Sequence, residues 1–412
     1  MSGAVAPDIK EKHEARVSQD TLALSKLNRW QIAALASICL AAVGGRILFA
    51  WWSLPPLESD FSWYRRAGLA AAHHGILSLF SSDPPVPIWV LSLWPPGYPF
   101  FLGLLYSVDS NIWLAPITQA VLSGFMCFIV FRTARRWGGN PWAAAAIVAF
   151  YPQAIVYSAI HGAETLTIFL LSLAAMAAVS SLRSRQAALY GLALGLTILT
   201  RCHAMLLAPG VIASLWRRWS TLAVLIVCAL LVLLPWAVSR SSIYHRPVLM
   251  TTFFGHLLYM GNHIDNTTGG YYEAPRPAEI PSGVTAPEED IYFLAAGLRE
   301  ILLHPGHYLL LTSRRALIWT GIEKDEWIDK YAPEWLGGLS LIAQLILFLA
   351  ALAATIEIWK DPRSGILLWP AVSLVILTSL SYHMPRYTLV ALPYFALIAS
   401  KLSMNYTKPT LS

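Results

Sequence analysis

Long apolar segments recur along this chain of 412 residues, and they constrain its fold more than any other feature. A helix that crosses the hydrocarbon core of a membrane needs about 20 mostly apolar residues. The segments therefore predict an all-α polytopic membrane protein with about ten crossings. The predicted crossings are 31–52, 111–131, 142–160, 164–181, 187–200, 203–216, 220–238, 336–358, 364–381 and 388–401.

Composition excludes several classes of protein. Hydrophobic residues make up 56% of the chain and charged residues only 13%, whereas a soluble domain carries about a quarter charged residues. The sequence is therefore not that of a soluble enzyme, a disordered protein, a fibrous repeat or a nucleic-acid binder. Its 4 cysteines show no paired spacing, so we expect neither a disulfide framework nor a zinc site.

Positive charge gathers on one side of the predicted bundle. Cytoplasmic turns of membrane proteins carry an excess of Lys and Arg, so we place this side, with both chain termini, in the cytoplasm. The formal net charge of +6 then reflects topology rather than a nucleic-acid partner. The compact length suggests a protein of the bacterial plasma (inner) membrane. The basic turns carry Arg132, Arg135, Arg136, Arg183, Arg185, Arg217, Arg218, Lys360 and Arg363.

Two long segments remain on the outer face, and every other turn is short. Long loops held by a rigid scaffold usually carry the chemistry, so we expect the functional site there. The apolar stretches 98–106 and 308–319 are too short to cross, and the second carries Arg314 and Arg315, so both are predicted to be interfacial helices. The predicted parts are a cytoplasmic tail (1–28), a transmembrane module (29–238) with the first outer loop (53–97), a second outer loop (239–335), and C-terminal transmembrane helices with a short cytoplasmic tail (336–412).

Two acidic residues, Glu58 and Asp60, come directly after the first predicted crossing. One interpretation is helix capping, because acids at a helix start bind free N–H groups and suit the helix dipole. The other is functional: carboxylates at the lipid–water boundary can take a proton from a hydroxyl or hold a metal ion. Acids are costly in such partly dehydrated surroundings, which favours the functional interpretation.

The segment 61–77 has the pattern of a helix lying at the membrane surface. Its apolar residues would face lipid, and its basic residues and histidines would face water. The two histidines are adjacent and cannot place both rings on one helix face, so they predict no metal site. Lipid-facing positions are Phe61, Tyr64 and Leu69, and water-facing positions are Arg65, Arg66, His73 and His74.

These residues resemble the first outer loop of the GT-C glycosyltransferases, which has two acids at the end of the first crossing and a tyrosine four residues after the second acid, here Tyr64. More narrowly, the chain is similar to the branch that contains protein O-mannosyltransferases and bacterial aminoarabinose transferases (family 39-like). Four further segments match that branch in the same order along the chain. They are Trp94–Pro99, Tyr190–Arg201, Leu257–Gly270, and Arg386-Tyr387 followed by Leu392-Pro393.

The resemblance implies a GT-C-like bundle of about ten transmembrane helices that acts as an inverting glycosyltransferase. The donor would be a sugar linked to polyprenyl phosphate. The acceptor would be a hydroxyl on the periplasmic face, carried by a glycolipid, a polysaccharide or a protein. Asp60 matches the family's catalytic base, and Glu58 is the second carboxylate, able to orient the acceptor or hold a divalent cation. The resemblance fixes no cofactor, because some relatives need a divalent cation and others do not.

Negative charge grows on the phosphate leaving group of such a reaction, so the site needs a cation, and arginine binds phosphate oxygens bidentately. The best candidate is Arg386 at the outer end of the last crossing, with His383 nearby; Arg201 in an outer turn can extend the phosphate site. Snorkelling to the interface is the structural alternative for these two arginines. Arg46 inside the first crossing either pairs with Glu164 or contacts the phosphate.

Further residues are candidates for the acceptor site or the cavity wall. Glu164 and His161 begin the fourth crossing at its outer end, where the family often has an acid; helix capping is the alternative for Glu164. Tyr64 belongs to the first-loop motif, and Asn262 to the Gly-Asn segment of the second outer loop. That loop, rich in turn formers, is expected to cover the cavity or to recruit the acceptor.

Three other functions remain open from the sequence. A transporter often shows repeated halves and broken helices near the bilayer middle, and neither is evident here. A polyprenyl-linked polysaccharide ligase or polymerase would also carry outer basic residues, but the acidic pair after the first crossing favours a transferase. The third alternative is a binding or assembly subunit that has the fold without the activity.

Overall fold

The computed structural model describes residues 27–53, 57–180, 182–361 and 364–402. Over these residues the chain forms α-helices and short 3-10 helices (η) and no strand, which confirms the predicted all-α polytopic membrane protein. The first half contains α2 (Arg29–Trp52), α3 (Ser59–His74), η1 (Ile76–Phe80), α4 (Ile88–Leu93), α5 (Gly97–Tyr106), α6 (Leu114–Trp137), α7 (Pro141–Phe150), α8 (Pro152–Ala159), α9 (Glu164–Val179) and α10 (Ser184–Thr200).

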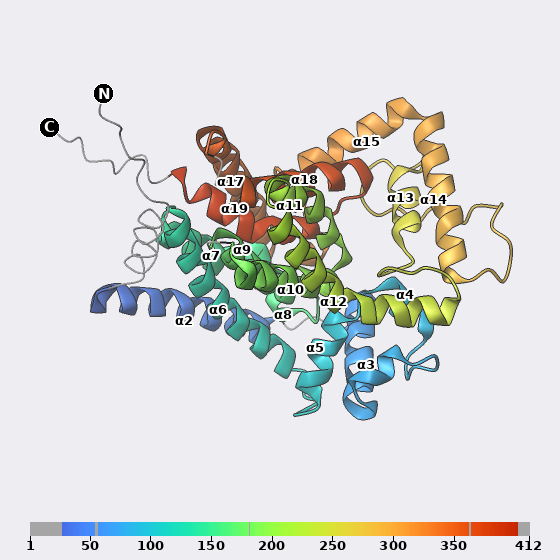
Figure 1. Cartoon of the computed structure of the whole chain (residues 1–412), viewed down its shortest axis with the longest axis horizontal. Coiled ribbons are helices and arrows are strands. Elements are labelled where there is room, and N and C mark those ends of the chain that lie inside the picture. The colour runs from blue at the N-terminus through green and yellow to red at the C-terminus, as the bar shows by residue number, and fades with distance from the viewer. Residues whose placement is uncertain (1–26, 54–56, 181, 362–363, 403–412) are drawn as a thin grey trace, which may run out of the picture.

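The second half ends in the helices that complete the bundle. In Figure 1, α2, α6 and α7 lie at the opposite end of the molecule from α13, α14 and α15, with α9 and α10 between them. The elements are η2 (Cys202–Leu207), α11 (Ala208–Leu215), α12 (Trp219–Tyr244), α13 (Phe254–Asn262), α14 (Ala286–Leu303), α15 (Pro305–Ile318), α16 (Glu326–Tyr331), α17 (Glu334–Ile358), α18 (Gly365–Ser381), η3 (Pro385–Ala391) and α19 (Leu392–Ala399).

Each predicted crossing coincides with a helix or with a pair of consecutive helices. Among the described helices, α2, α6, α12 and α17 are long and apolar enough to cross a membrane, and α7 and α8, which meet at a 48° bend, make a fifth when the pair is counted as one span. The other predicted crossings are shorter helices, such as α9 and α18. Both short stretches predicted to be interfacial helices are helical, as α5 and α15.

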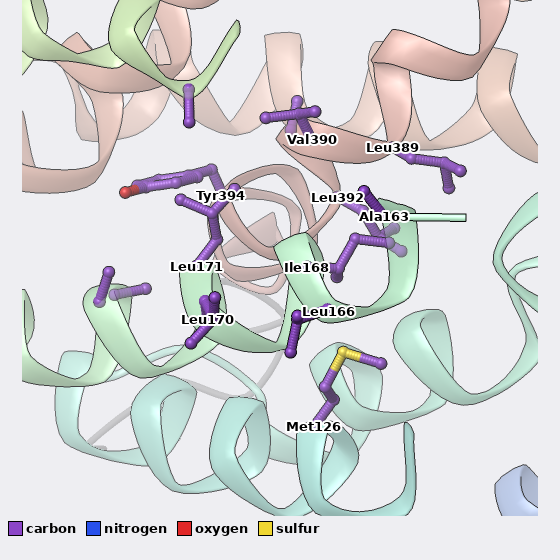
Figure 2. Close-up of a cluster of buried hydrophobic side chains, with 14 of the residues drawn as sticks. Met126, Ala163, Leu166, Ile168, Leu170, Leu171, Leu389, Val390, Leu392 and Tyr394 are labelled. Atoms are coloured by element: carbon purple, nitrogen blue, oxygen red, sulfur yellow. The ribbon is translucent and has the colours of Figure 1, made fainter. Parts of the chain in front are cut away.

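The helix α9 lies at the centre of the bundle. It packs against α6, α8 and α10 and against the C-terminal helices, and none of its side chains is exposed. Figure 2 shows Leu166, Leu170 and Leu171 of α9 between Met126 of α6 and the η3–α19 segment, all in one buried cluster. Because burial removes apolar surface from the lipid and fixes rotamers, α9 holds its first residue, Glu164, at a fixed point inside the protein.

Arg46 of α2 binds main-chain carbonyls at the break between α7 and α8. Its side chain is 1% exposed, and it donates hydrogen bonds to the carbonyls of Val148 (3.0 Å) and Ala149 (2.8 Å). In an unbroken helix the Val148 carbonyl would accept from residue 152, but Pro152 has no N–H group. The ion pair of Arg46 with Glu164, one of the two predicted roles, is therefore wrong. The Arg46 guanidinium binds the carbonyl groups at the helix break, and Glu164 pairs with Arg201.

The helix α3 covers residues 61–74 of the predicted surface helix 61–77, and η1 begins at Ile76. Two predicted orientations are wrong. Phe61 and Tyr64 are buried inside the protein rather than facing lipid. The Phe61 ring lies 4.7 Å from the Trp327 ring of α16, and the Tyr64 ring lies 5.2 Å from Tyr98 of α5. Tyr64 turns inward because α5 packs against α3, and Phe61 because Trp327 of α16 lies against it, tertiary contacts that the helical period alone cannot reveal.

Two close contacts fix loops beside the bundle. A Cβ atom on Gly97 would lie 2.6 Å from the Leu199 carbonyl oxygen and 2.8 Å from Thr200 Cα, so only glycine lets α5 begin directly against the end of α10. Arg315 of α15 is fully buried and donates to Gly261 O and Asn262 Oδ1 at the end of α13. Arg315 thus joins α15 to α13 through hydrogen bonds in the protein interior.

We predict that Arg46→Met destabilises the fold by about 2 kcal/mol, because the carbonyls of Val148 and Ala149 would lose charged donors in a dry interior. The measurement is the thermal unfolding midpoint of the purified protein in detergent. The control is Arg29→Met, at an exposed position at the start of the same helix. Equal midpoints for the two variants would contradict the role given to Arg46.

Candidate active site

Four charged side chains meet where several helix ends converge. Asp60 lies in the first turn of α3, and Glu164 is the first residue of α9. Arg201 follows the last residue of α10, and Arg386 lies in η3. The four segments are far apart in the sequence, and helix ends suit charged groups because their free N–H and C=O groups carry partial charge.

Asp60 and Arg386 form an ion pair. Arg386 Nη1 lies 3.1 Å from Asp60 Oδ2, and the two side chains are 14% and 16% exposed. Ser59 Oγ donates to Asp60 Oδ1 at 2.7 Å. Burial raises the pKa of the Asp60 carboxyl, but Arg386 and the Ser59 hydroxyl together hold it below its ordinary value of 3.8. Asp60 is therefore an ionised carboxylate at neutral pH.

Glu164 and Arg201 form a second ion pair, at 2.6 Å, with side chains 3% and 10% exposed. The aromatic ring of Tyr387 connects the two pairs. Its centroid lies 4.9 Å from Arg201 Cζ and 5.8 Å from Arg386 Cζ. A ring face attracts cations, so Tyr387 holds the two guanidinium groups close together despite their like charge.

Several polar atoms of this cluster are buried without a protein partner among the described residues. They are Glu164 Oε2, Arg201 Nε and Arg386 Nε. Most buried polar atoms in proteins are hydrogen-bonded to protein or to ordered water. The cluster therefore keeps one acceptor and two donors free for water or for a ligand that carries both kinds of group.

Tyr64 lies beside the cluster. Burial and the Asp60 charge raise the pKa of its hydroxyl, so the group keeps its proton at neutral pH. The same phenol interacts electrostatically with Glu164 and with the two arginines. Its ring is held in place edge-on against Tyr98 and Trp94. The predicted cavity residues Tyr64 and Glu164 are thus brought together with Asp60.

Glu58 lies at the N-cap position of α3, but its side chain makes no capping hydrogen bond. It pairs with Lys330 of α16, and both side chains are partly exposed. An exposed ion pair contributes little to stability on its own, so its main effect is to join α16 to the start of α3. The side-chain capping interpretation of Glu58 is therefore wrong.

The remaining predicted residues have other surroundings. His383 is fully buried and stacks on Trp319 at 4.7 Å, and burial lowers its pKa to about 3. His161 is also buried, with a pKa lowered to about 4 by burial and by Arg65. Both are neutral at pH 7. Asn262 uses its amide on Leu258 O, Ser381 O and Arg315, and Arg46 uses its guanidinium on carbonyls, so neither joins the cluster.

Sequence reasoning missed a third acid near the cluster. Asp325 lies between α15 and α16, is 6% exposed, and interacts electrostatically with Arg386. It accepts hydrogen bonds from Tyr157 and Gln153 of α8. Its position before Glu326-Trp327 looked like an ordinary loop acid, and no sequence signal marked it. In the described part of the chain, no three residues of the His, Cys, Asp and Glu types are grouped so as to hold a metal ion.

Solved structures of similar architecture identify the fold. ArnT from Cupriavidus metallidurans bound to undecaprenyl phosphate matches 93% of this chain and 61% of that chain, with a TM-score of 0.53 and 15% identity. The archaeal oligosaccharyltransferase AglB from Archaeoglobus fulgidus, in complex with an inhibitory peptide and a dolichol-phosphate, matches 92% of this chain and 50% of that chain, with a TM-score of 0.50 and 14% identity.

The chain thus spans 61% and 50% of the length of these two structures. No protein-family model and no curated protein matches the sequence. The likeness shows that the chain shares the fold of these two structures.

We predict that the Asp60–Arg386 pair stabilises the fold in a pH-dependent way. Because the pKa of Asp60 is lower in the folded chain than its ordinary value of 3.8, the stabilisation is complete above that value and is lost as pH falls through the folded pKa. The difference in thermal midpoint between wild type and Asp60→Asn should therefore be constant above about pH 5 and shrink as the pH falls from about 4 to about 2. A difference that stays constant over this range would contradict the pairing; Asp265→Asn, at an exposed acid, is the control.

Proposed function

We propose that this chain is a membrane glycosyltransferase that moves a sugar from a polyprenyl-phosphate donor to an acceptor hydroxyl, with inversion. The observation that carries the proposal is the buried cluster in which the Asp60 carboxylate meets the guanidinium groups of Arg386 and Arg201. Two proteins of the same fold support it, since the ArnT structure contains undecaprenyl phosphate and the AglB structure contains a dolichol-phosphate.

Arg386 and Arg201 have the chemistry to bind the phosphate of the donor. The phosphate leaves with growing negative charge, and fixed guanidinium groups stabilise charge that develops in a transition state. Each arginine has a buried Nε–H group without a protein partner, so each can donate a further hydrogen bond to a phosphate oxygen. The Tyr387 ring lies close to both guanidinium groups, so one phosphate can bind the two together.

Asp60 has the chemistry of the general base. Inversion requires the acceptor hydroxyl to attack from the side opposite the phosphate, and a nearby carboxylate then takes its proton. In the present structure Arg386 lowers the basicity of Asp60. A donor phosphate competes for Arg386 and so releases the carboxylate, which couples donor binding to activation of the base.

Glu164 and Tyr64 are the proposed contacts of the acceptor. Glu164 Oε2 is a buried acceptor without a protein partner, and it suits a sugar or serine hydroxyl. The acceptor belongs to one of three classes: glycolipid, polysaccharide or protein. We further propose that the cluster faces the periplasm of a bacterial inner membrane and that both termini are cytoplasmic, because the sequence predicts that the basic turns lie on the cytoplasmic side. Glu58 is proposed as an accessory carboxylate at the edge of the site.

Asp60→Asn should abolish transfer, with a loss of about 10²-fold or more, because the base is removed. The same change should tighten binding of undecaprenyl phosphate, since Arg386 loses its internal partner. The measurements are release of polyprenyl phosphate from a panel of polyprenyl-phosphate sugars and the Kd for undecaprenyl phosphate. Asp83→Asn, at an exposed acid of the same loop, is the control. Normal transfer by Asp60→Asn would overturn the catalytic assignment.

Arg386→Ala should raise the Kd for undecaprenyl phosphate by about 10- to 100-fold, because one hydrogen-bonded charge contact with the phosphate is removed. The KM for the acceptor should change little. Arg386→Lys should recover part of the affinity through charge without the bidentate geometry. The control is Arg314→Ala, at an exposed position of α15. Equal donor affinity in wild type and Arg386→Ala would refute the phosphate role.

A further inference from the structure

A buried amide side chain binds the backbone next to Arg386. Gln153 of α8 is 1% exposed, and its Nε2 donates to Asp325 Oδ2 at 3.0 Å and to the Pro385 carbonyl oxygen at 3.2 Å. Its Oε1 accepts from Thr388 Oγ1 at 3.2 Å. One side chain of α8 therefore binds both the second outer loop and η3, the segment that carries Arg386.

Asp325 is the second member of this network. Its Oδ1 accepts from Tyr157 Oη at 3.0 Å and from the Trp327 N–H at 3.0 Å, while Oδ2 accepts from Gln153. Asp325 is also the N-cap residue of α16. A carboxylate with this many donors is fixed in place, which suits a structural anchor better than a proton acceptor for substrate.

The helix α16, which Asp325 anchors, lies over the start of α3. Trp327 packs edge-on against Phe61, the residue after Asp60, with 4.7 Å between ring centroids. Lys330 pairs with Glu58, two residues before Asp60. The network thus reaches both members of the ion pair: it holds Asp60 through α16 and Arg386 through the Pro385 carbonyl.

We propose that Gln153 and Asp325 are positioning residues that set the separation of Asp60 and Arg386. The expected effect on substrate binding rests on the proposed function, in which Arg386 binds the phosphate of the donor. A displacement of about 1 Å in a reacting group can cost about 10²-fold in rate. Side chains that hold the substrate-contacting residues in place therefore affect binding and turnover, although they do not contact the substrate themselves.

The test compares Gln153→Leu with Gln344→Leu. Gln344 of α17 is a matched control, because it is also a buried amide, 6% exposed, that donates to a main-chain carbonyl, Ile318 O at 2.7 Å. Both variants should lower the thermal midpoint to a similar extent. Only Gln153→Leu should raise the Kd for undecaprenyl phosphate, by about tenfold, and only it should speed hydrogen exchange in residues 326–331 and 385–391.

Swapping the amide and the carboxylate between positions 153 and 325 separates the two hydrogen bonds that Gln153 donates, one to Asp325 and one to the Pro385 carbonyl. Asp325→Asn alone places an amide N–H group opposite the Gln153 amide N–H group, so this hydrogen bond is lost. The variant should therefore bind undecaprenyl phosphate more weakly. The double variant Gln153→Glu with Asp325→Asn restores that hydrogen bond in the opposite direction, but leaves the Pro385 carbonyl without a donor. We expect the double variant to recover slow hydrogen exchange in residues 326–331. Hydrogen exchange in residues 385–391 should stay fast, and the affinity for undecaprenyl phosphate should stay weak.

The outcomes distinguish this inference from the proposed function. Identical exchange in 385–391 for the Gln153→Leu and Gln344→Leu variants would overturn the inference, whatever the protein binds. If wild type does not bind undecaprenyl phosphate, the proposed function fails, and the exchange data alone decide whether Gln153 positions Arg386. If exchange rises but the Kd for undecaprenyl phosphate stays that of wild type, the positioning role is also wrong.

Discussion

The fold depends on how main-chain carbonyls are satisfied where helices break. Carbonyl groups buried in a protein must find a partner other than bulk water, and this chain supplies buried arginines. Arg46 binds the end of α7, Arg315 binds the end of α13, and Arg240 binds the Leu79 carbonyl of η1 at 2.9 Å. Each guanidinium group offers several donors in a fixed geometry, so one side chain replaces several lost helix bonds.

These breaks make the polar centre possible. A straight span would carry its ends to the two membrane surfaces, whereas the 48° bend between α7 and α8 turns α8 so that Gln153 and Tyr157 reach Asp325. The starts of α3 and α9 and the end of α10 then meet at η3. Two ion pairs are held around the Tyr387 ring in surroundings where a lone charge would be expensive.

Much of the fold was predictable from the sequence, because long apolar segments leave few alternatives to membrane helices. The ion pair of Asp60 with Arg386 joins two residues that the family motifs had already selected for one site. The pairing of Arg46 with Glu164 was wrong, because apolar periodicity does not show which helix end an arginine will meet. Asp325 was missed, because its neighbours in sequence resemble those of any polar loop and its partners come from α8.

The contact of Gly97 with Leu199 and Thr200 has a consequence for the evolution and redesign of this protein. The start of α5 abuts the chain one residue before Arg201, with no room for a side chain between them. If the segment 53–97 were exchanged between relatives, the new segment would need a glycine at this position and a matching end of α10. Chimaeras that transplant this segment alone would shift the Arg201 guanidinium group and, with it, the Glu164–Arg201 ion pair.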